Sequence, residues 1–192
     1  MITHARQRST LSLVTFAAAI ALAGCADETT TGPAEQAAIP TTRAAARGPV
    51  LGECDEIAVP AGSKLVFHAY AEGAQIYQWD GGAWAFRGPS AKLYADAAGT
   101  GTVGIHYGGP TWESNSGSLV VGTLNTPCER GPADIPWLLL DAARSEGPGI
   151  FDRVAFIQRV NTVGGRAPTV PGSLGEVRNV PYTAEYFFYR AR

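Results

Sequence analysis

The segment "IHYGGPTWES", residues 105–114, holds the side chains of this chain that are best suited to chemistry. Histidine titrates near neutral pH, so His106 and Glu113 form a candidate general acid/base pair, or two ligands of a metal ion. Between them, Trp112 offers a flat apolar surface for a sugar or an aromatic ligand. The alternative, which we favour, is a hairpin in which Trp112 fills the core and His106 makes one polar bond.

Two further sets of side chains are candidates for ligand binding. In "IQRVNTVGG", residues 157–165, Arg159 and Asn161 would share one strand face, where the planar donors of arginine suit a carboxylate or a phosphate. In the last segment, residues 182–192, Tyr186 belongs to a row of aromatic side chains that would line an apolar pocket. The simpler alternatives are an ion pair at the sheet surface and cross-strand aromatic packing.

Other catalytic and metal-binding patterns are missing from the sequence. "TWESNSGS", residues 111–118, places serines close to His106 but contains no G-x-S-x-G turn for a nucleophile. Gly164 and Gly165 lack the lysine and hydroxyl residue of a phosphate-binding loop. The chain has no C-x-x-C pair and few histidines, so a zinc site is not indicated. We therefore predict no cofactor and no metal site.

Alternating apolar and polar residues predict that these side chains stand on β-strands. Runs such as "KLVFHAY", residues 64–70, alternate over their whole length. Turns are expected at Glu72-Gly73, at Asp80-Gly81-Gly82 and at Gly88-Pro89, and the second of these is a strong hairpin signal. We count about nine strands and few helices. This pattern favours an all-β fold, either an antiparallel β-sandwich or a partly closed barrel.

Two parts of this pattern leave alternatives open. Val103, Ile105 and Tyr107 share one face of a strand and are expected to meet the core. His106 then points to solvent, to a lumen or into a cleft. Residues 135–163 fit either strands or helix, although β-branched and aromatic residues in their second half favour strand.

The N-terminus predicts export and a lipid anchor. Arg6 and Arg8 precede an apolar run, residues 11–22, which has the length of a secretory signal and leads into "LAGC". This ending resembles the lipobox of bacterial lipoproteins, in which Cys25 receives a diacylglycerol. The alternative is an ordinary signal peptide with a cysteine near its cleavage site. Ala26 follows in place of the aspartate that would favour inner-membrane retention, so the outer membrane is favoured.

These features divide the chain into a lipoprotein signal peptide (1–24), a tether (25–52) and one β domain (53–192). The tether is rich in Ala, Thr, Pro and Gly and has no hydrophobic period. Without Arg6 and Arg8 the chain has 13 basic and 17 acidic side chains, and no basic stripe. Nucleic acid is therefore not an expected partner. The expected location is the cell envelope outside the cytoplasm, with the membrane as one partner.

Two cysteines remain once Cys25 is assigned to the lipid. Cys54 and Cys128 flank the first half of the domain and, in an oxidising compartment, are predicted to form a disulfide. The alternative is two buried free thiols, since spacing alone does not fix the geometry of a disulfide.

Five segments, in order, resemble one known family. They are "GAQIYQWDGGAWAFRGPSAKLYAD", "VGIHYGGPTWES", "IPWLLLDA", "FIQRVNTVGGRAP" and "VPYTAEYFFY". Residues 53–191 are thereby similar to the domain-of-unknown-function family 3455, found in secreted bacterial and fungal proteins. The resemblance implies no established activity. It also implies a cysteine in many relatives where this chain has Trp79, and another near Ser173, so the pairing of Cys54 with Cys128 is judged on its own.

Three functional hypotheses follow from these patterns. The first is a non-enzymatic, lipid-anchored envelope domain that binds a small molecule, a glycan or an envelope protein through one end of the sandwich or barrel. The second is an extracytoplasmic hydrolase or lyase that uses His106 and Glu113. The third is a structural envelope protein with a filled core. A binding or structural module is favoured over an enzyme.

Overall fold

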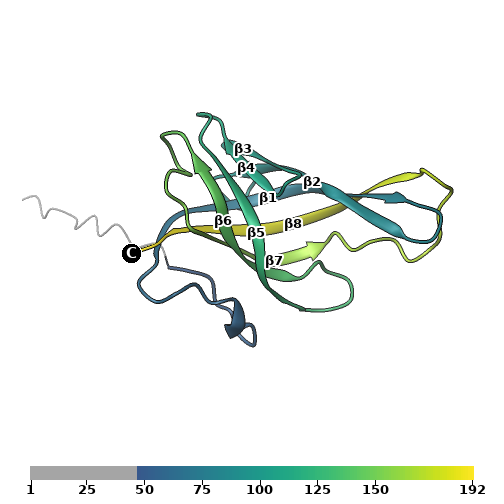
Figure 1. Ribbon diagram of the computed structural model, residues 1–192, viewed down its shortest axis with the longest axis horizontal. Coiled ribbons are helices and arrows are strands. Elements are labelled where there is room, and N and C mark those ends of the chain that lie inside the picture. Colours follow the sequence, from purple (N-terminus) through teal and green to yellow (C-terminus); the bar gives the residue numbers. More distant parts are fainter. Residues whose placement is uncertain (1–46) are drawn as a thin grey trace, which may run out of the picture. The chain divides into compact units, whose positions relative to one another are not determined.

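A computed structural model describes residues 47–192, so the predicted signal peptide and the lipidation residue Cys25 lie outside the described part of the chain. Eight antiparallel strands each pair with the next along the chain, and β8 pairs back with β1 to close a barrel (Figure 1). The elements are η1 (Asp55–Ile57), β1 (Lys64–Trp79), β2 (Trp84–Tyr94), β3 (Thr102–Tyr107), β4 (Thr111–Ser114), β5 (Leu119–Cys128), β6 (Trp137–Glu146), β7 (Phe156–Gly164) and β8 (Val177–Arg190). In residues 47–192 we find no helix with the length and apolar character needed to cross a membrane.

The predicted all-β, antiparallel fold is confirmed, and the barrel is fully closed. Two of the expected turns, at Glu72-Gly73 and Gly88-Pro89, lie inside strands, so β1 and β2 run for 16 and 11 residues. A Cβ atom on Gly73 would lie 2.1 Å from the carbonyl oxygen of Ser90, so only glycine allows the two strands to approach this closely. Gly73 therefore continues β1 instead of ending it. Because the two expected turns lie inside strands, the barrel has eight strands where about nine were predicted.

The long strands β1, β2 and β8 extend beyond the others as an arm (Figure 1). The predicted hairpin turn at Asp80-Gly81-Gly82 lies at the tip of this arm. The rings of Trp79 and Trp84 meet there with their centroids 5.5 Å apart. Trp79 also exchanges backbone hydrogen bonds with Gly175 and Glu176, in the loop that contains Ser173. The arm is thus held by tryptophan packing and by the loop before β8.

Residues 135–163, which fit strands or helix by sequence, contain β6 and β7. The chain between these strands carries Phe151 into one end of the barrel, where its ring is fully buried. Its centroid lies 6.0 Å from the ring of Phe67 and 4.7 Å from the ring of Phe188. Phe151 therefore fills this end of the barrel, which we call the closed end.

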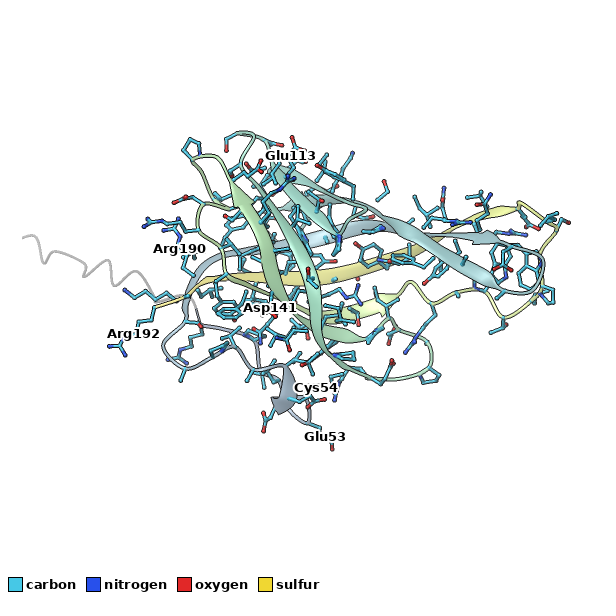
Figure 2. The ribbon with its side chains drawn as sticks, in the orientation of Figure 1. Glu53, Cys54, Glu113, Asp141, Arg190 and Arg192 are labelled. Atoms are coloured by element: carbon cyan, nitrogen blue, oxygen red, sulfur yellow. A yellow bond between two sulfur atoms is a disulfide. The ribbon has the colours of Figure 1, made fainter. Side chains whose placement is uncertain are left out.

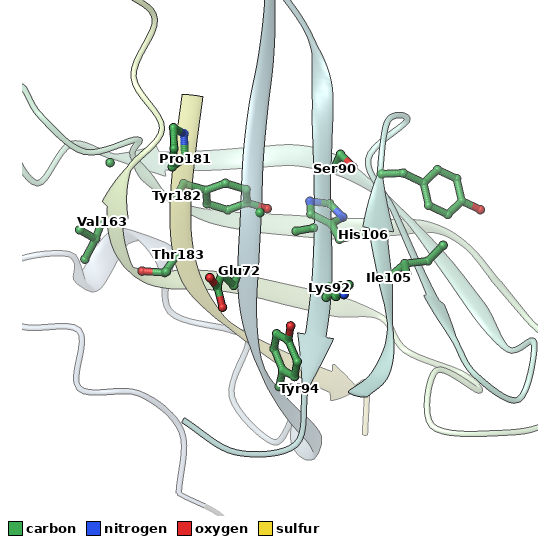
Figure 3. A pocket seen from close by; sticks show the side chains of 14 residues that line it. Glu72, Ser90, Lys92, Tyr94, Ile105, His106, Val163, Pro181, Tyr182 and Thr183 are labelled. Carbon is green, nitrogen blue, oxygen red and sulfur yellow. The ribbon is translucent and has the colours of Figure 1, made fainter. Parts of the chain in front are cut away.

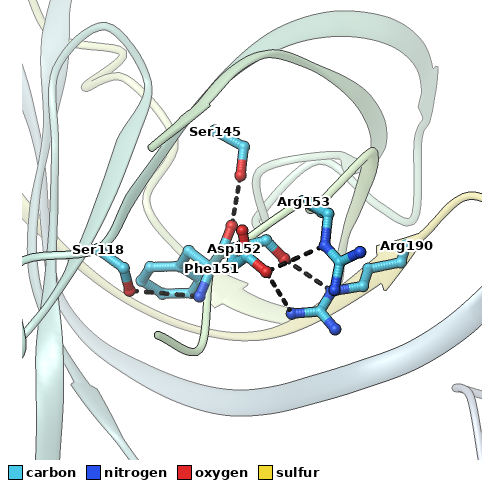
Figure 4. Close-up of polar contacts among 6 residues, drawn as sticks. All are labelled: Ser118, Ser145, Phe151, Asp152, Arg153 and Arg190. Carbon is cyan, nitrogen blue, oxygen red and sulfur yellow. Dashed lines mark hydrogen bonds and ion pairs between the residues drawn. The ribbon is translucent and has the colours of Figure 1, made fainter. Parts of the chain in front are cut away.

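Polar contacts fix the segment that carries Phe151 (Figure 4). The Ser145 hydroxyl donates to the Phe151 carbonyl oxygen at 2.5 Å, and the Phe151 N–H donates to Ser118 Oγ at 3.3 Å. On β8, Arg190 donates to the carbonyl oxygen and the carboxylate of Asp152 at 2.7 and 3.2 Å. Side chains from β6, from β8 and from the turn before β5 thus hold the closed end in place.

A second apolar cluster covers the outer face of β6, β7 and β8, and the segment around η1 packs onto it. Its buried members are Cys54, Ile57, Cys128, Trp137, Leu139, Val160, Phe187 and Tyr189. The predicted disulfide between Cys54 and Cys128 is confirmed and ties this segment to the end of β5 (Figure 2). Gln158 adds a polar link, since it donates to the Ile57 carbonyl oxygen and accepts from the Tyr189 hydroxyl, both at 2.7 Å. This cover explains why β8 is aromatic on both faces.

Removal of the disulfide in the double variant Cys54→Ala/Cys128→Ala is expected to destabilise the fold. The crosslink closes a loop of 74 residues, so its loss should lower the free energy of unfolding by about 4 kcal/mol. Urea denaturation of the purified full chain measures this difference, with Cys25→Ala as the matched cysteine control. A loss under about 1 kcal/mol would mean that the crosslink contributes little to the fold.

Candidate functional site

The end of the barrel opposite Phe151 contains a cavity of about 270 Å³, which we call the barrel cavity. All eight strands contribute to its lining, and eight strands leave an interior just wide enough to be filled or to hold one small ligand. Leu124, Leu138 and Leu140 supply apolar surface. The polar side chains inside the barrel are Gln75, His106, Trp112, Arg159 and Tyr186.

Three packed rings form the floor of the barrel cavity. His106 on β3 pairs with Trp112 on β4, and the two rings stack with centroids 4.3 Å apart and planes 9° apart. Tyr186 on β8 meets both rings edge-on, at 5.1 and 5.2 Å. A Cβ atom on Gly122 would lie 3.0 Å from the Trp112 indole, so glycine on β5 leaves room for this ring. The floor is therefore built from tightly fitted aromatic side chains.

The face of β3 that meets the interior is the opposite of the predicted one. His106 is 3% exposed, whereas Ile105 and Tyr107 are 47% and 36% exposed on the outer face. β3 and β4 approach closely here, since a Cβ atom on Gly104 would lie 2.2 Å from the carbonyl oxygen of Glu113. Gly104 and the ring of His106 face the interior, Ile105 and Tyr107 lie outside, and the half-buried Val103 still packs against the core.

His106 is held in one neutral form. Its Nδ1 lies 2.8 Å from the Thr111 carbonyl oxygen, which can only accept, so Nδ1 carries the proton and Nε2 is the acceptor of the ring. Burial lowers the pKa of His106 to about 3; the hydrogen bond to Thr111 opposes this shift, and the positive charge of Arg159 adds to it. At neutral pH the ring is therefore uncharged.

The structure does not bring His106 and Glu113 together. Glu113 lies on the outer face of β4, opposite Ile105, and its carboxylate accepts from the Tyr107 hydroxyl at 2.9 Å. Side chains of neighbouring residues in a strand point to opposite faces, so the barrel wall separates Glu113 from the face of Trp112 and His106. The proposed acid/base or metal-ligand pair has no common point in this arrangement.

Arg159 and Asn161, which were expected to share a face, also lie apart. Arg159 lines the barrel cavity, and its Nε and Nη2 donate to the Pro136 carbonyl oxygen at 3.1 and 2.8 Å. Asn161 lies in an irregular part of β7 with a φ of 50°, and donates to Glu185 at 2.9 Å. The irregularity breaks the strand alternation on which the expectation rested.

Two buried donors of the cavity lining lack hydrogen-bond partners within residues 47–192. They are Gln75 Nε2 and Trp112 Nε1, on side chains that are 2% and 1% exposed. Leaving a buried donor unpaired costs about 1–3 kcal/mol, so such donors are rare in folded proteins. Sequence reasoning missed Gln75, whose signal is a lone amide on the same strand face as Ala71 and Tyr77.

A larger hollow, which we call the outer groove, lies on the outside of the barrel (Figure 3). It measures about 780 Å³ and is lined mostly by exposed side chains such as Glu72, Lys92 and Thr183. The buried side chains of His106 and Tyr182 also contribute to its lining. Among residues 47–192, neither unpartnered buried donor lies in its lining. The two unpartnered donors therefore favour the barrel cavity over the outer groove as a ligand site.

A metal site is not supported where potential ligands gather. Cys54, Glu56 and Cys128 place candidate ligand atoms within 4.8 Å of one another. Both sulfurs are joined in the disulfide, so neither is a thiolate that could bind an ion.

The match to a known protein family covers the whole barrel. The sequence model of a family described as "Protein of unknown function (DUF3455)" matches residues 60–190. This range contains every strand and therefore every strand residue that lines the barrel cavity. Neither the curated proteins nor the solved structures include a match to this chain.

The buried state of His106 predicts a pH dependence of stability. The pKa of His106 is about 3 in the folded chain and near 6.5 in the unfolded chain, so only the unfolded chain takes up the proton between these values. The stabilisation is present above the unfolded pKa and is lost as the pH falls. The loss should reach about 2 kcal/mol at pH 5 relative to neutral pH.

Urea denaturation of the full chain at pH 7.5 and pH 5 measures this loss. In His106→Gln the loss between the two pH values is expected to disappear, because glutamine does not titrate. His68→Gln, on the outer face, is the matched control and should keep it. An equal loss in the native chain and in His106→Gln would contradict the assignment to His106.

Proposed function

The chain belongs to the DUF3455 family, whose description states no function, and we propose that its barrel is a binding module for one small molecule. The observation that carries this proposal is the pair of buried, unpartnered donors, Gln75 Nε2 and Trp112 Nε1, in the lining of a cavity. A ligand acceptor would satisfy them. The volume of about 270 Å³ is sufficient, since a cavity of about 150 Å³ already holds benzene.

Binding accounts for the geometry of the cavity better than catalysis does. The leucines give the ligand an apolar wall, and the rings of His106, Trp112 and Tyr186 give it a flat floor. This combination of apolar surface and a few convergent polar groups is typical of ligand sites. The alternative, a hydrolase or lyase, would need His106 and Glu113 at one point, and the barrel wall lies between them.

We also propose that the barrel is held at the cell envelope, with the outer membrane favoured, by a lipid on Cys25. Support for this anchor comes from the sequence alone: the basic start, the apolar run and the lipobox-like ending. More than one acyl chain is needed for stable anchoring, and lipoproteins of this kind carry at least a diacylglycerol. The proposed module would therefore bind its ligand outside the cytoplasm.

Closing the mouth of the barrel cavity should prevent binding. Leu124 lines the cavity and is 55% exposed, so Leu124→Trp is expected to obstruct the opening without disturbing the core. We expect at least one of benzoate, benzamide and benzyl alcohol to raise the melting temperature of the full chain, and binding to weaken about tenfold or more in this variant.

The matched control is Ile105→Trp, which places the same side chain on the outer face, where Ile105 is 47% exposed. Isothermal titration of the three probes into both variants and the native chain gives the dissociation constants. Unchanged binding in Leu124→Trp would place the ligand elsewhere, and no binding of any probe to the native chain would count against the proposal.

Lipidation is tested separately from ligand binding. The full chain, produced in a bacterium supplied with an alkyne-labelled fatty acid, should carry the label, because Cys25 is the proposed acceptor. Cys25→Ala should lose all label, whereas Cys54→Ala/Cys128→Ala should keep it. In-gel fluorescence after coupling to a dye measures the label, and a labelled Cys25→Ala chain would contradict the anchor.

A further inference from the structure

The charges around the barrel cavity have one sign. Its lining contains two arginines, Arg87 and Arg159, and no aspartate or glutamate. Arg87 is exposed and donates to the Gln78 side chain at 3.1 Å, so it belongs to the rim. Arg159 is half-buried and belongs to the interior. The potential inside the cavity therefore favours a negatively charged group.

Arg159 has a neutral partner and no counterion. Within residues 47–192 the ion pairs formed by arginine, lysine and histidine do not include Arg159. Its hydrogen bonds to the Pro136 carbonyl oxygen leave its positive charge uncompensated. Removing such a charge from water is costly unless an opposite charge accompanies it. A bound anion would provide that charge.

The effect of this charge extends across the cavity floor. Burial raises the pKa of the Tyr186 hydroxyl, and the positive charge of Arg159 acts against that shift. The same charge helps to keep His106 uncharged, so His106 adds no second cation. Among the described residues that line the interior of the cavity, Arg159 is thus the cation, and Gln75, His106, Trp112 and Tyr186 are uncharged at neutral pH.

The remaining polar groups also require an acceptor. The indole N–H of Trp112 and the amide N–H of Gln75 are donors, and both lack partners among the described residues. A carboxylate accepts several hydrogen bonds at once, including those of a guanidinium. Inorganic phosphate carries more than one negative charge near neutral pH, so one arginine does not balance it, and it has no apolar part for the leucines.

We propose that the barrel cavity binds the carboxylate of a small organic acid, with Arg159, Gln75 and Trp112 as donors and the leucines against the apolar body of the acid. This inference rests on the proposed function, because it names the ligand class of the same cavity. It makes Arg159 the residue that determines specificity for charge. It also accounts for an arginine without a counterion and for two donors without partners, which simple packing does not explain.

The test compares three probes in the unaltered full chain by isothermal titration: benzoate, its neutral isostere benzamide, and inorganic phosphate. Benzoate is expected to bind about tenfold or more tightly than benzamide, because its charge-assisted hydrogen bonds are stronger. Phosphate is expected to bind more weakly than either. This comparison needs no variant, so it decides the matter even if a substitution at Arg159 impairs folding.

Variants then assign the preference to one residue. In Arg159→Met, benzoate should bind no more tightly than benzamide, and benzamide affinity should be retained as the sign of an intact cavity. Arg144→Met removes an exposed arginine that pairs with Glu146 outside the cavity lining, and it should keep the preference for benzoate.

The outcomes separate the two proposals. Equal binding of benzoate and benzamide would overturn the carboxylate assignment and leave the binding module standing. A preference for benzoate that survives in Arg159→Met would overturn the role of Arg159. Phosphate binding tighter than benzoate binding would overturn the choice of an organic acid. Failure of benzoate, benzamide and benzyl alcohol alike to bind would overturn this inference and the proposed function together.

Discussion

Pairing of β1 with β8 closes the sheet, and the space available inside the protein follows from that closure. The two strands pair from Lys64 and Arg190 at the closed end to Gln78 and Val177 on the arm. A closed ring of eight strands has no free edges and an interior that side chains almost fill. Phe151 fills one end of the barrel, and at the other end all eight strands contribute to the lining of the barrel cavity.

The polar groups of this interior fall into two kinds. Some are satisfied by the protein itself, as His106 is by the Thr111 carbonyl oxygen. Others, Gln75 and Trp112, have no partner among the described residues, and Arg159 has no counterion there. Groups that locally oppose stability are the expected mark of a functional site in an otherwise consistent fold. Their convergence on one cavity links the stability of the barrel to its proposed ligand.

Much of this arrangement could be predicted from the sequence, and the failures have identifiable physical causes. Alternation of apolar and polar residues predicted the strands and the all-β fold. It placed a turn at Gly73, because the neighbouring residues do not reveal that another strand approaches this glycine closely. Counting apolar residues misplaced the interior face of β3, because an exposed Ile105 is tolerated outside and a stacked His106 is well packed inside. The residue type of Arg159 indicates a carboxylate or phosphate as ligand, and this stays a prediction. The separation of Arg159 from Asn161 was not anticipated, because an irregular register follows from three-dimensional pairing.

The most direct test of the central claim follows the indole N–H of Trp112 by nuclear magnetic resonance in the full chain. The chain has four tryptophans, and their indole signals can be assigned by comparison with Trp112→Phe. On titration with benzoate, the Trp112 signal should move as its donor gains an acceptor, while the signals of Trp79, Trp84 and Trp137 stay in place. A stationary Trp112 signal at saturating benzoate, or movement of the others alone, would contradict a ligand site in the barrel cavity.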